Sequence, residues 1–189
     1  RLGDVDRLVY PRSAVKALQA LPLVETGTAD RFGFGAAELA LACGSHAGTE
    51  RHTHLAAAML ERAGLSESAL GCGAHAPLGA SAANALIKAG EAPSQLHNNC
   101  SGKHAAMLGF AHSKQWKKHG YERPEHPVQI AVLHEVAKWT QLRPSQIEMS
   151  VDGCGVPVFA LSLERMAAAY ARLGAASHRG EEVPARVLG

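Results

Sequence analysis

Short apolar helices that end at glycines are the feature of this sequence that most constrains its fold. Apolar side chains recur at helical spacing, and Gly44, Gly64 and Gly90 each follow such a segment, where a glycine commonly ends a helix. The predicted helices cover residues 12–24, 36–43, 49–63, 81–89, 101–118, 127–140 and 163–173. Between residues 146 and 163 the pattern changes to alternation, a Gly-rich turn and a second apolar run, which predicts a strand, a tight turn and another buried segment. We therefore expect an α+β chain that is mostly helical.

The composition excludes several classes of partner. The formal net charge is +2, and the Lys and Arg residues are scattered, which argues against nucleic acid. No apolar run approaches the roughly 20 residues that span a bilayer. Four cysteines at wide spacings do not resemble a disulfide framework and fit a reducing compartment. We expect a cytoplasmic protein that binds neither nucleic acid nor membranes.

The densest group of reactive side chains lies in residues 97–104, which read HNNCSGKH. This run carries a thiol, an amine and several imidazole and amide groups, and it leads directly into an apolar helical pattern. A core segment has no use for so many polar groups, because buried polar atoms are costly unless they are paired. The run predicts the wall of a site.

Ser13 and Lys16 form a Ser-x-x-Lys pattern at the start of a predicted helix. Residues three apart are neighbours on a helix, so the amine of Lys16 can reach the hydroxyl of Ser13. A serine becomes a nucleophile when a base takes its proton, and a desolvated lysine with a lowered pKa can be that base. The pattern also fits an N-cap serine followed by a solvated lysine.

Ser45 lies between two glycines in the run CGSHAG, which follows a predicted apolar helix. A serine at such a turn is placed to be exposed, and the neighbouring His46 could donate a hydrogen bond to a bound substrate. The same run fits a glycine that ends one helix and a serine that caps the next. Both interpretations stay open on the sequence pattern.

Cys100, Lys103 and Cys154 form a third candidate group. Two thiolates bind zinc well, and a neutral lysine amine can supply a nitrogen ligand. The turn around Cys154 also carries a carboxylate, Asp152. The cysteines fit equally well as small buried apolar residues, because no Cys-x-x-Cys pair is present.

Taken together, five runs in this order resemble the rhizobial-type L-asparaginases, the asparaginase II family. The runs are PRSAVKALQALP (11–22), SHAG (45–48), CG with His75 and Pro77 (72–77), HNNCSGKH (97–104) and DGCGVP (152–157). The likeness covers residues 9–173. It implies hydrolysis of the side-chain amide of L-asparagine to L-aspartate and ammonia.

The resemblance also implies roles for individual residues. It places Ser13 and Lys16 in one catalytic Ser–Lys pair and Ser45 as the serine of a second. The expected substrate-binding residues are His46, His104 and Asp152. A zinc ion that orients the substrate, rather than activating water, is expected on Cys100, Lys103 and Cys154.

The implied fold is similar to that of serine β-lactamases and penicillin-binding proteins, with a helical domain against an α/β domain, usually as a homodimer. The corresponding division here is residues 1–30 in an incomplete α/β domain, 31–145 in a helical domain, and 146–189 returning to the α/β domain. The sequence departs from the family pattern in three places. The family has a Glu soon after the Ser-His-x-Gly run, whereas here Thr49 stands before Glu50. The lysine that partners the second serine should lie beyond Cys154, but no lysine follows Asp152. The family's opening strands, before the Ser-x-x-Lys helix, are also missing. We therefore expect a chain truncated at both ends and inactive by itself.

Two alternative functions remain. Ser-x-x-Lys is also typical of penicilloyl-type serine hydrolases, although no Lys-Thr-Gly follows here. The third candidate is a non-catalytic, zinc-holding remnant domain.

Overall fold

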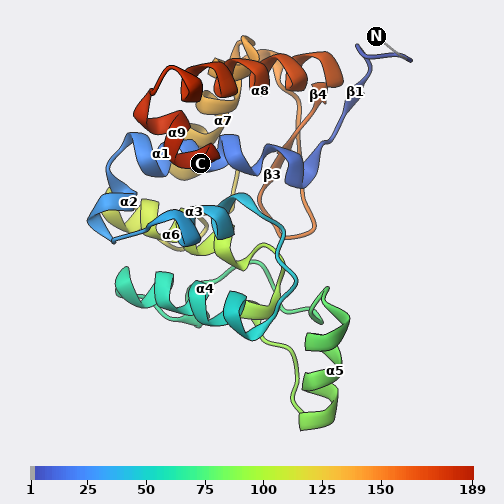
Figure 1. The fold of residues 1–189 in the computed structure, drawn as a ribbon, viewed down its shortest axis with the longest axis vertical. Helices are drawn as coiled ribbons and strands as arrows, with labels where there is room; N and C mark the ends of the chain where they lie inside the picture. Colours follow the sequence, from blue (N-terminus) through green and yellow to red (C-terminus); the bar gives the residue numbers. More distant parts are fainter. Residues whose placement is uncertain (1–2) are drawn as a thin grey trace.

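The computed structural model describes residues 3–189 and shows a mostly helical α+β chain (Figure 1). The α-helices are α1 (Lys16–Glu25), α2 (Thr28–Arg31), α3 (Ala36–Cys43), α4 (Glu50–Arg62), α5 (Ala80–Ala89), α6 (Ser101–Ser113), α7 (Pro127–Thr140), α8 (Leu163–His178) and α9 (Glu182–Leu188). The strands are β1 (Leu8–Val9), β2 (Met149–Val151), β3 (Pro157–Phe159) and β4 (Leu161–Ser162). Short 3₁₀ turns are η1 (Arg12–Val15), η2 (Glu67–Ala69), η3 (Gln95–His97) and η4 (Pro144–Gln146). A helix is present in each predicted helical segment, and α3 and α7 also have the predicted bounds.

Five predicted helices have different bounds, although α4 and α5 differ by no more than one residue at either end. The helix predicted from residue 12 begins as the 3₁₀ turn η1, and α1 starts at Lys16. α6 ends at Ser113 rather than at residue 118, because Gln115 has a left-handed φ of 58° that no α-helix continues through. α8 runs on to His178, past the predicted residue 173. Helix interiors were therefore predicted better than helix ends.

The four strands form two separate antiparallel pairs. β2 pairs with β3, with Met149 opposite Phe159 and Val151 opposite Pro157. The turn between them closes where Gly155 N donates to Asp152 O at 2.9 Å, and Gly155 has a φ of +92°, which glycine adopts without strain. The predicted strand, turn and second buried segment are confirmed. β1 pairs with β4, which joins the start of the described chain to the segment before α8.

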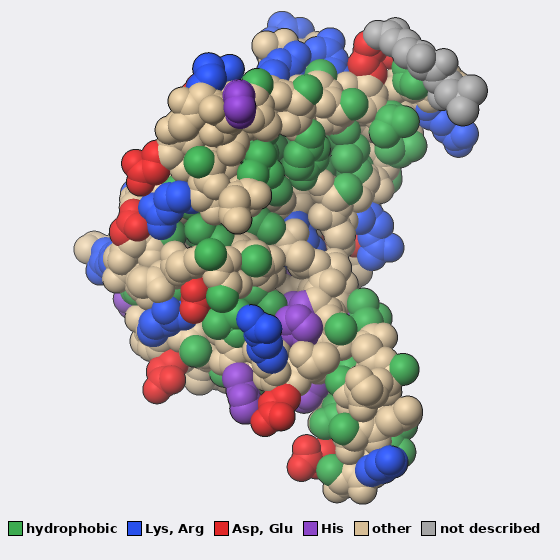
Figure 2. Space-filling view, in the orientation of Figure 1, with side chains coloured by type: hydrophobic (Ala, Val, Ile, Leu, Met, Phe, Trp, Pro, Cys, Tyr) green, Lys and Arg blue, Asp and Glu red, His purple; other side chains and the backbone are tan. Residues whose placement is uncertain are grey.

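α1 lies at the centre of the molecule and contacts α3, α6, α7 and α9 (Figure 1). Its apolar side chains Leu18 and Leu21 are fully buried. α4 packs against α6 on the side away from α1 (Figure 1). α5 projects from the body, as Figures 1 and 2 show, and has no buried residue. Within residues 3–189, no helix is both long and apolar enough to cross a membrane.

α6 is the most completely enclosed helix, since every residue from Ser101 to Ala111 is buried. Its first turn approaches α3 very closely at Gly102. A Cβ on Gly102 would lie 2.5 Å from Leu41 Cγ and 2.7 Å from Leu41 O. Glycine is thus required here, because a backbone oxygen and a buried side chain fill the space of any larger residue.

Gly102→Ala should therefore destabilise the fold by about 2 kcal/mol or more, as overpacking a filled core does. Gly174→Ala in α8 is the matched control, because a Cβ there meets nothing within 4 Å and alanine favours a helix by roughly 1 kcal/mol. Urea unfolding of the two variants measures both effects. Equal stability of the two variants would contradict the packing described here.

Candidate active site

The buried amine of Lys16 is the centre of the candidate site. Lys16 is the first residue of α1 and is 1% exposed. Its Nζ donates to Gly44 O at 2.6 Å, to Ser45 Oγ at 2.9 Å and to Asn99 O at 3.5 Å. The amine therefore joins the start of α1 to the segments that follow α3 and precede α6.

Ser13 reaches this amine through Ser45. Ser13 Oγ and Ser45 Oγ are 2.6 Å apart, and the same Ser45 oxygen accepts from Lys16. The Ser-x-x-Lys pattern predicted a direct contact between Ser13 and Lys16, but Gly44 O and Ser45 Oγ draw the amine toward the end of α3. The structure thus brings together all three residues expected to be catalytic, in the order Ser13, Ser45, Lys16.

The surroundings of Lys16 favour the loss of its proton. Burial lowers the pKa of Lys16, and the nearby Lys103 adds to this, while Cys100 opposes it. A neutral amine has two N–H donors and one lone pair. The carbonyls of Gly44 and Asn99 can only accept, so a neutral Lys16 that bonds both directs its lone pair at the Ser45 hydroxyl. This geometry allows Lys16 to take a proton from Ser45.

Asn99 contacts Ser45, and His75 contacts Asn99. Neither residue had a role predicted from the sequence. Asn99 Nδ2 donates to Ser45 Oγ at 3.3 Å, and Asn99 N donates to His75 Nε2 at 3.2 Å. His75 Nδ1 lies 2.6 Å from Ala76 O, so the ring donates there and accepts at Nε2. The dense polar run at residues 97–104 indicated that Asn99 lies at a site. His75 was indicated only by its position in the run 72–77, one of the five that resemble the family.

A cavity of about 310 Å³ opens beside Ser13. Its lining residues are Arg12, Ser13, His75, Leu78, Asn98, Asn99, Cys100, Asp152, Gly153 and Cys154. Arg12 Nε donates to Asp152 Oδ1 at 2.8 Å, and the Asp152 side chain is 10% exposed. The cavity therefore presents both charges to a ligand. It contains Asp152, one of the expected substrate-binding residues.

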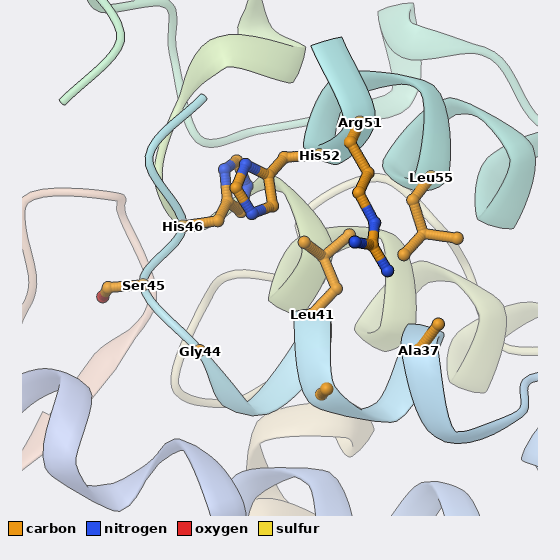
Figure 3. Close-up of a pocket in the computed structure, with 9 residues that line it drawn as sticks. Ala37, Leu41, Gly44, Ser45, His46, Arg51, His52 and Leu55 are labelled. Atoms are coloured by element: carbon orange, nitrogen blue, oxygen red, sulfur yellow. The ribbon is translucent and has the colours of Figure 1, made fainter. Parts of the chain in front are cut away.

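His46 faces away from this cavity. Figure 3 shows the side chains of Ser45 and His46 on opposite sides of the same segment, with His46 beside His52 and Arg51 at a second cavity of about 310 Å³. His46 Nδ1 accepts from Gly48 N at 3.2 Å, and Nε2 lies 2.9 Å from Ser101 Oγ. Both ring nitrogens are thus engaged within the protein, which gives His46 a structural environment.

The third group lies at the wall of the first cavity, which Cys100 and Cys154 both line. Lys103 Nζ donates to Cys154 Sγ at 3.2 Å. The Cys100 contact, aided by His104 and Lys103, lowers the pKa of Cys154 to about 2, although burial opposes it. The Cys154 contact and burial raise the pKa of Cys100. The Lys103 amine and the Cys154 sulfur are therefore in contact, and the Cys100 thiol lies at the same cavity.

His104 is completely buried and lines neither cavity. Its Nδ1 is 2.5 Å from the hydroxyl of Tyr121, and its Nε2 has no well-formed hydrogen bond. Burial lowers the pKa of His104, which disfavours the charged ring. The structure thus places His104 beneath the cysteine pair rather than at the cavity beside Ser13.

The donor set of Cys100, Lys103 and Cys154 fits a soft cation such as zinc. Among the described residues, no group of three or more His, Cys, Asp or Glu side chains is arranged to hold a metal ion. A metal site here would accordingly need Lys103 as its third donor. Thiolate and neutral amine are both suitable ligands for zinc.

The fold and the site define a class of protein: an α+β chain in which a buried amine contacts paired hydroxyls beside a small charged cavity. The sequence matches the family model for L-asparaginase II over residues 1–188. The chain therefore belongs to the L-asparaginase II family, which confirms the resemblance. Membership implies, at the level of the family, a hydrolase that acts on asparagine. A comparison with curated proteins finds no match.

His46 makes the stability of the protein depend on pH. Burial, with added repulsion from His52, lowers the pKa of His46 from 6.5 to about 4. The unfolded chain therefore binds the extra proton first, so this contribution is present above pH 6.5 and is lost as the pH falls toward 4. It amounts to at most about 3 kcal/mol.

Replacing His46 by Gln should flatten the fall in unfolding free energy between pH 6.5 and 4, as measured by urea titrations at several pH values. His134→Gln is the matched control, because His134 is exposed on α7. The control should keep the slope of the unaltered protein. An unchanged slope in His46→Gln would show that His46 does not carry the effect.

Proposed function

We propose that this chain hydrolyses the side-chain amide of L-asparagine to L-aspartate and ammonia, with Ser13 as nucleophile, Ser45 as proton relay and Lys16 as base. The observation that carries the proposal is the continuous contact from Ser13 Oγ to Ser45 Oγ to Lys16 Nζ, at 2.6 Å and 2.9 Å. Ser13 lines the cavity that holds the charged pair, whereas Lys16 is buried behind it. In the proposed reaction, the nucleophile therefore lies next to the substrate and the base lies out of water.

The proposed reaction uses this contact twice. Ser13 Oγ attacks the amide carbon, its proton passes to Ser45, and the Ser45 proton passes to Lys16. The protonated Lys16 then returns a proton along the same path to the leaving nitrogen, which departs as ammonia and leaves an ester on Ser13. Water attacks the ester while Lys16 again takes a proton along the same path. The C–O bond to Ser13 then breaks, Lys16 returns the proton to the Ser13 oxygen, and aspartate is released. Asn99 keeps Ser45 in position by donating to its oxygen.

Substrate recognition is assigned to Arg12 and Asp152. An amino acid carries one ammonium and one carboxylate group, and these two side chains offer the complementary charges. Both hydrogen bonds of the Asp152 carboxylate within the protein, from Arg12 and from Gly153 N, go to Oδ1, so Oδ2 can accept from the substrate ammonium. The cavity of about 310 Å³ lies at the small end of ligand sites, as suits a single amino acid.

Zinc is the proposed metal, held by Cys100, Lys103 and Cys154. When bound, it would supply a positive charge that orients the substrate, because serine nucleophiles are already present. A serine β-lactamase-like architecture and a homodimer are further parts of the proposal that rest on family membership. A cytoplasmic location is also proposed, and it rests on the wide spacing of the four cysteines. If the chain is instead a non-catalytic, zinc-holding domain, it should bind zinc and release no ammonia from asparagine.

The catalytic assignment predicts that Ser13→Ala, Ser45→Ala and Lys16→Met each lower ammonia release from L-asparagine by more than tenfold. A tenfold loss corresponds to about 1.4 kcal/mol of barrier, the least expected from an essential proton-transfer group. Ser81→Ala and Lys88→Met are matched controls, since both residues are exposed on α5. A variant that keeps more than a tenth of the ammonia release contradicts the assignment. No release by the unaltered chain would contradict the proposed activity and would agree with the sequence-based expectation that the chain is inactive by itself.

The metal assignment predicts one zinc per chain, with content lost in Cys100→Ser and Cys154→Ser and kept in Cys43→Ser. The first two variants remove a thiolate donor, whereas Cys43 is not part of the donor group. Affinity should fall at low pH, because thiolates and the amine must be deprotonated to bind. Elemental analysis after dialysis measures the content. Equal zinc in all three variants would rule out this site.

A further inference from the structure

We propose that the second cavity, the one beside His46, binds a small organic carboxylate with a short aliphatic body. This cavity has a volume of about 310 Å³, and its walls come from α3, from residues 44–46 and from the first two turns of α4 (Figure 3). Asparagine hydrolysis makes no use of it. The proposal therefore goes beyond the proposed function and does not rest on it.

Arg51 brings to this cavity a positive charge that no group of the protein uses. Its side chain makes no hydrogen bond or ion pair within residues 3–189. Figure 3 shows the side chain extending from α4 toward α3, with the guanidinium between Leu41 and Leu55, which line the same cavity. A guanidinium binds a carboxylate through two parallel N–H···O hydrogen bonds. Arg51 therefore offers a binding group for a carboxylate.

His52 adds a second donor to the same cavity. Its Nδ1 accepts from Thr49 N at 3.2 Å, so the hydrogen of the neutral ring lies on Nε2. No hydrogen-bond partner for Nε2 is present in the part of the chain that the structure describes. The ring also stacks on His46, with 5.1 Å between the ring centroids. Contacts with Thr49 and His46 therefore hold the ring in place and leave one N–H free for a ligand.

The other lining side chains determine the body of the ligand. Ala40, Leu41 and Leu55 are apolar and suit a short aliphatic chain. They offer no hydrogen bonds to the further oxygens of a phosphate or sulfate, whose burial without partners is costly. A carboxylate joined to an apolar body fits this combination better than an inorganic anion does.

The charges of the two cavities differ in a way that separates their ligands. Among the described residues, no Asp or Glu lines the second cavity, whereas Asp152 lines the cavity beside Ser13. The ammonium group of an amino acid would therefore find no partner at Arg51, and burying it unpaired is costly. The second cavity is expected to prefer a carboxylate that carries no amine.

The two cavities also lie on opposite sides of residues 44–46. Arg51 and His52 line only the second cavity, and the hydroxyl of Ser45 turns away from them to contact Ser13 at 2.6 Å (Figure 3). A ligand bound at Arg51 therefore leaves the cavity beside Ser13 open. We expect no competition between a carboxylate in the second cavity and a ligand beside Ser13.

The test titrates the unaltered chain with sodium butyrate and follows binding by ligand-detected NMR. Butyrate should bind saturably, with a Kd in the millimolar range, as suits a ligand of so few atoms. Butylamine and n-butanol have the same aliphatic body without the carboxylate, so neither should bind at the same concentration. Excess inorganic phosphate or L-asparagine should not displace butyrate.

Variants then locate the site. Arg51→Met should weaken butyrate binding about tenfold or more, because it removes the guanidinium and keeps an apolar stem. Ala40→Phe should also prevent binding by filling the cavity, and Ala40 is exposed, so the larger side chain does not overpack the core. Arg12→Met is the matched control, because it removes a guanidinium from the cavity beside Ser13, and it should keep the affinity of the unaltered chain.

Several results would overturn the proposal. They are no saturable binding of butyrate, equal binding of butylamine, displacement of butyrate by phosphate or asparagine, and affinity that is lost in Arg12→Met but kept in Arg51→Met. The comparison of probes uses the unaltered chain and needs no variant to fold. None of the measurements depends on ammonia release, so failure of the proposed hydrolysis and failure of this site are separate outcomes.

Discussion

The burial of the Lys16 amine is the constraint on which the rest of the site depends. An ammonium group taken out of water is costly unless it is paired, yet no carboxylate contacts Lys16 among the described residues. Two backbone carbonyls and one hydroxyl provide its hydrogen bonds instead. The segment at Gly44 and the segment at Asn99 must both lie against the start of α1 for these bonds to form. Folding the helices together and assembling the site are therefore the same event.

The packing of α6 against α3 supports this arrangement. Gly102 lets the first turn of α6 approach Leu41 so closely that no other residue fits, and Cys100, Lys103 and Asn99 all lie within three residues of that contact. One of the two carbonyls that Lys16 uses, that of Asn99, and two of the three proposed metal ligands, Cys100 and Lys103, are thus set by one helix–helix contact. A substitution that separates α6 from α3 is expected to disturb both chemistries together.

Much of the fold followed from local patterns, and most of the site did not. Residues 36–43 and 127–140 carry clear helical patterns with strong end signals, such as Pro127 at the start of α7, and their bounds were predicted correctly. The left-handed Gln115 that ends α6 has no signature in the sequence. Ser13, Lys16 and Ser45 were identified, but their order of contact depends on where Gly44 O lies, which is a tertiary feature. A histidine beside Ser45 suggests a substrate-binding residue from the sequence. Only the folded structure shows that both ring nitrogens of His46 contact other groups of the protein.

The central claim is that Ser13 is the nucleophile and receives its activation from Lys16 through Ser45. The most direct measurement treats the protein with an electrophilic asparagine analogue that carries a diazoketone in place of the side-chain amide, and maps the label by mass spectrometry. The account predicts stoichiometric labelling of Ser13 that disappears in Lys16→Met and is prevented by excess L-asparagine. A label on Ser45 or on another residue, or labelling of Ser13 that does not need Lys16, would contradict it.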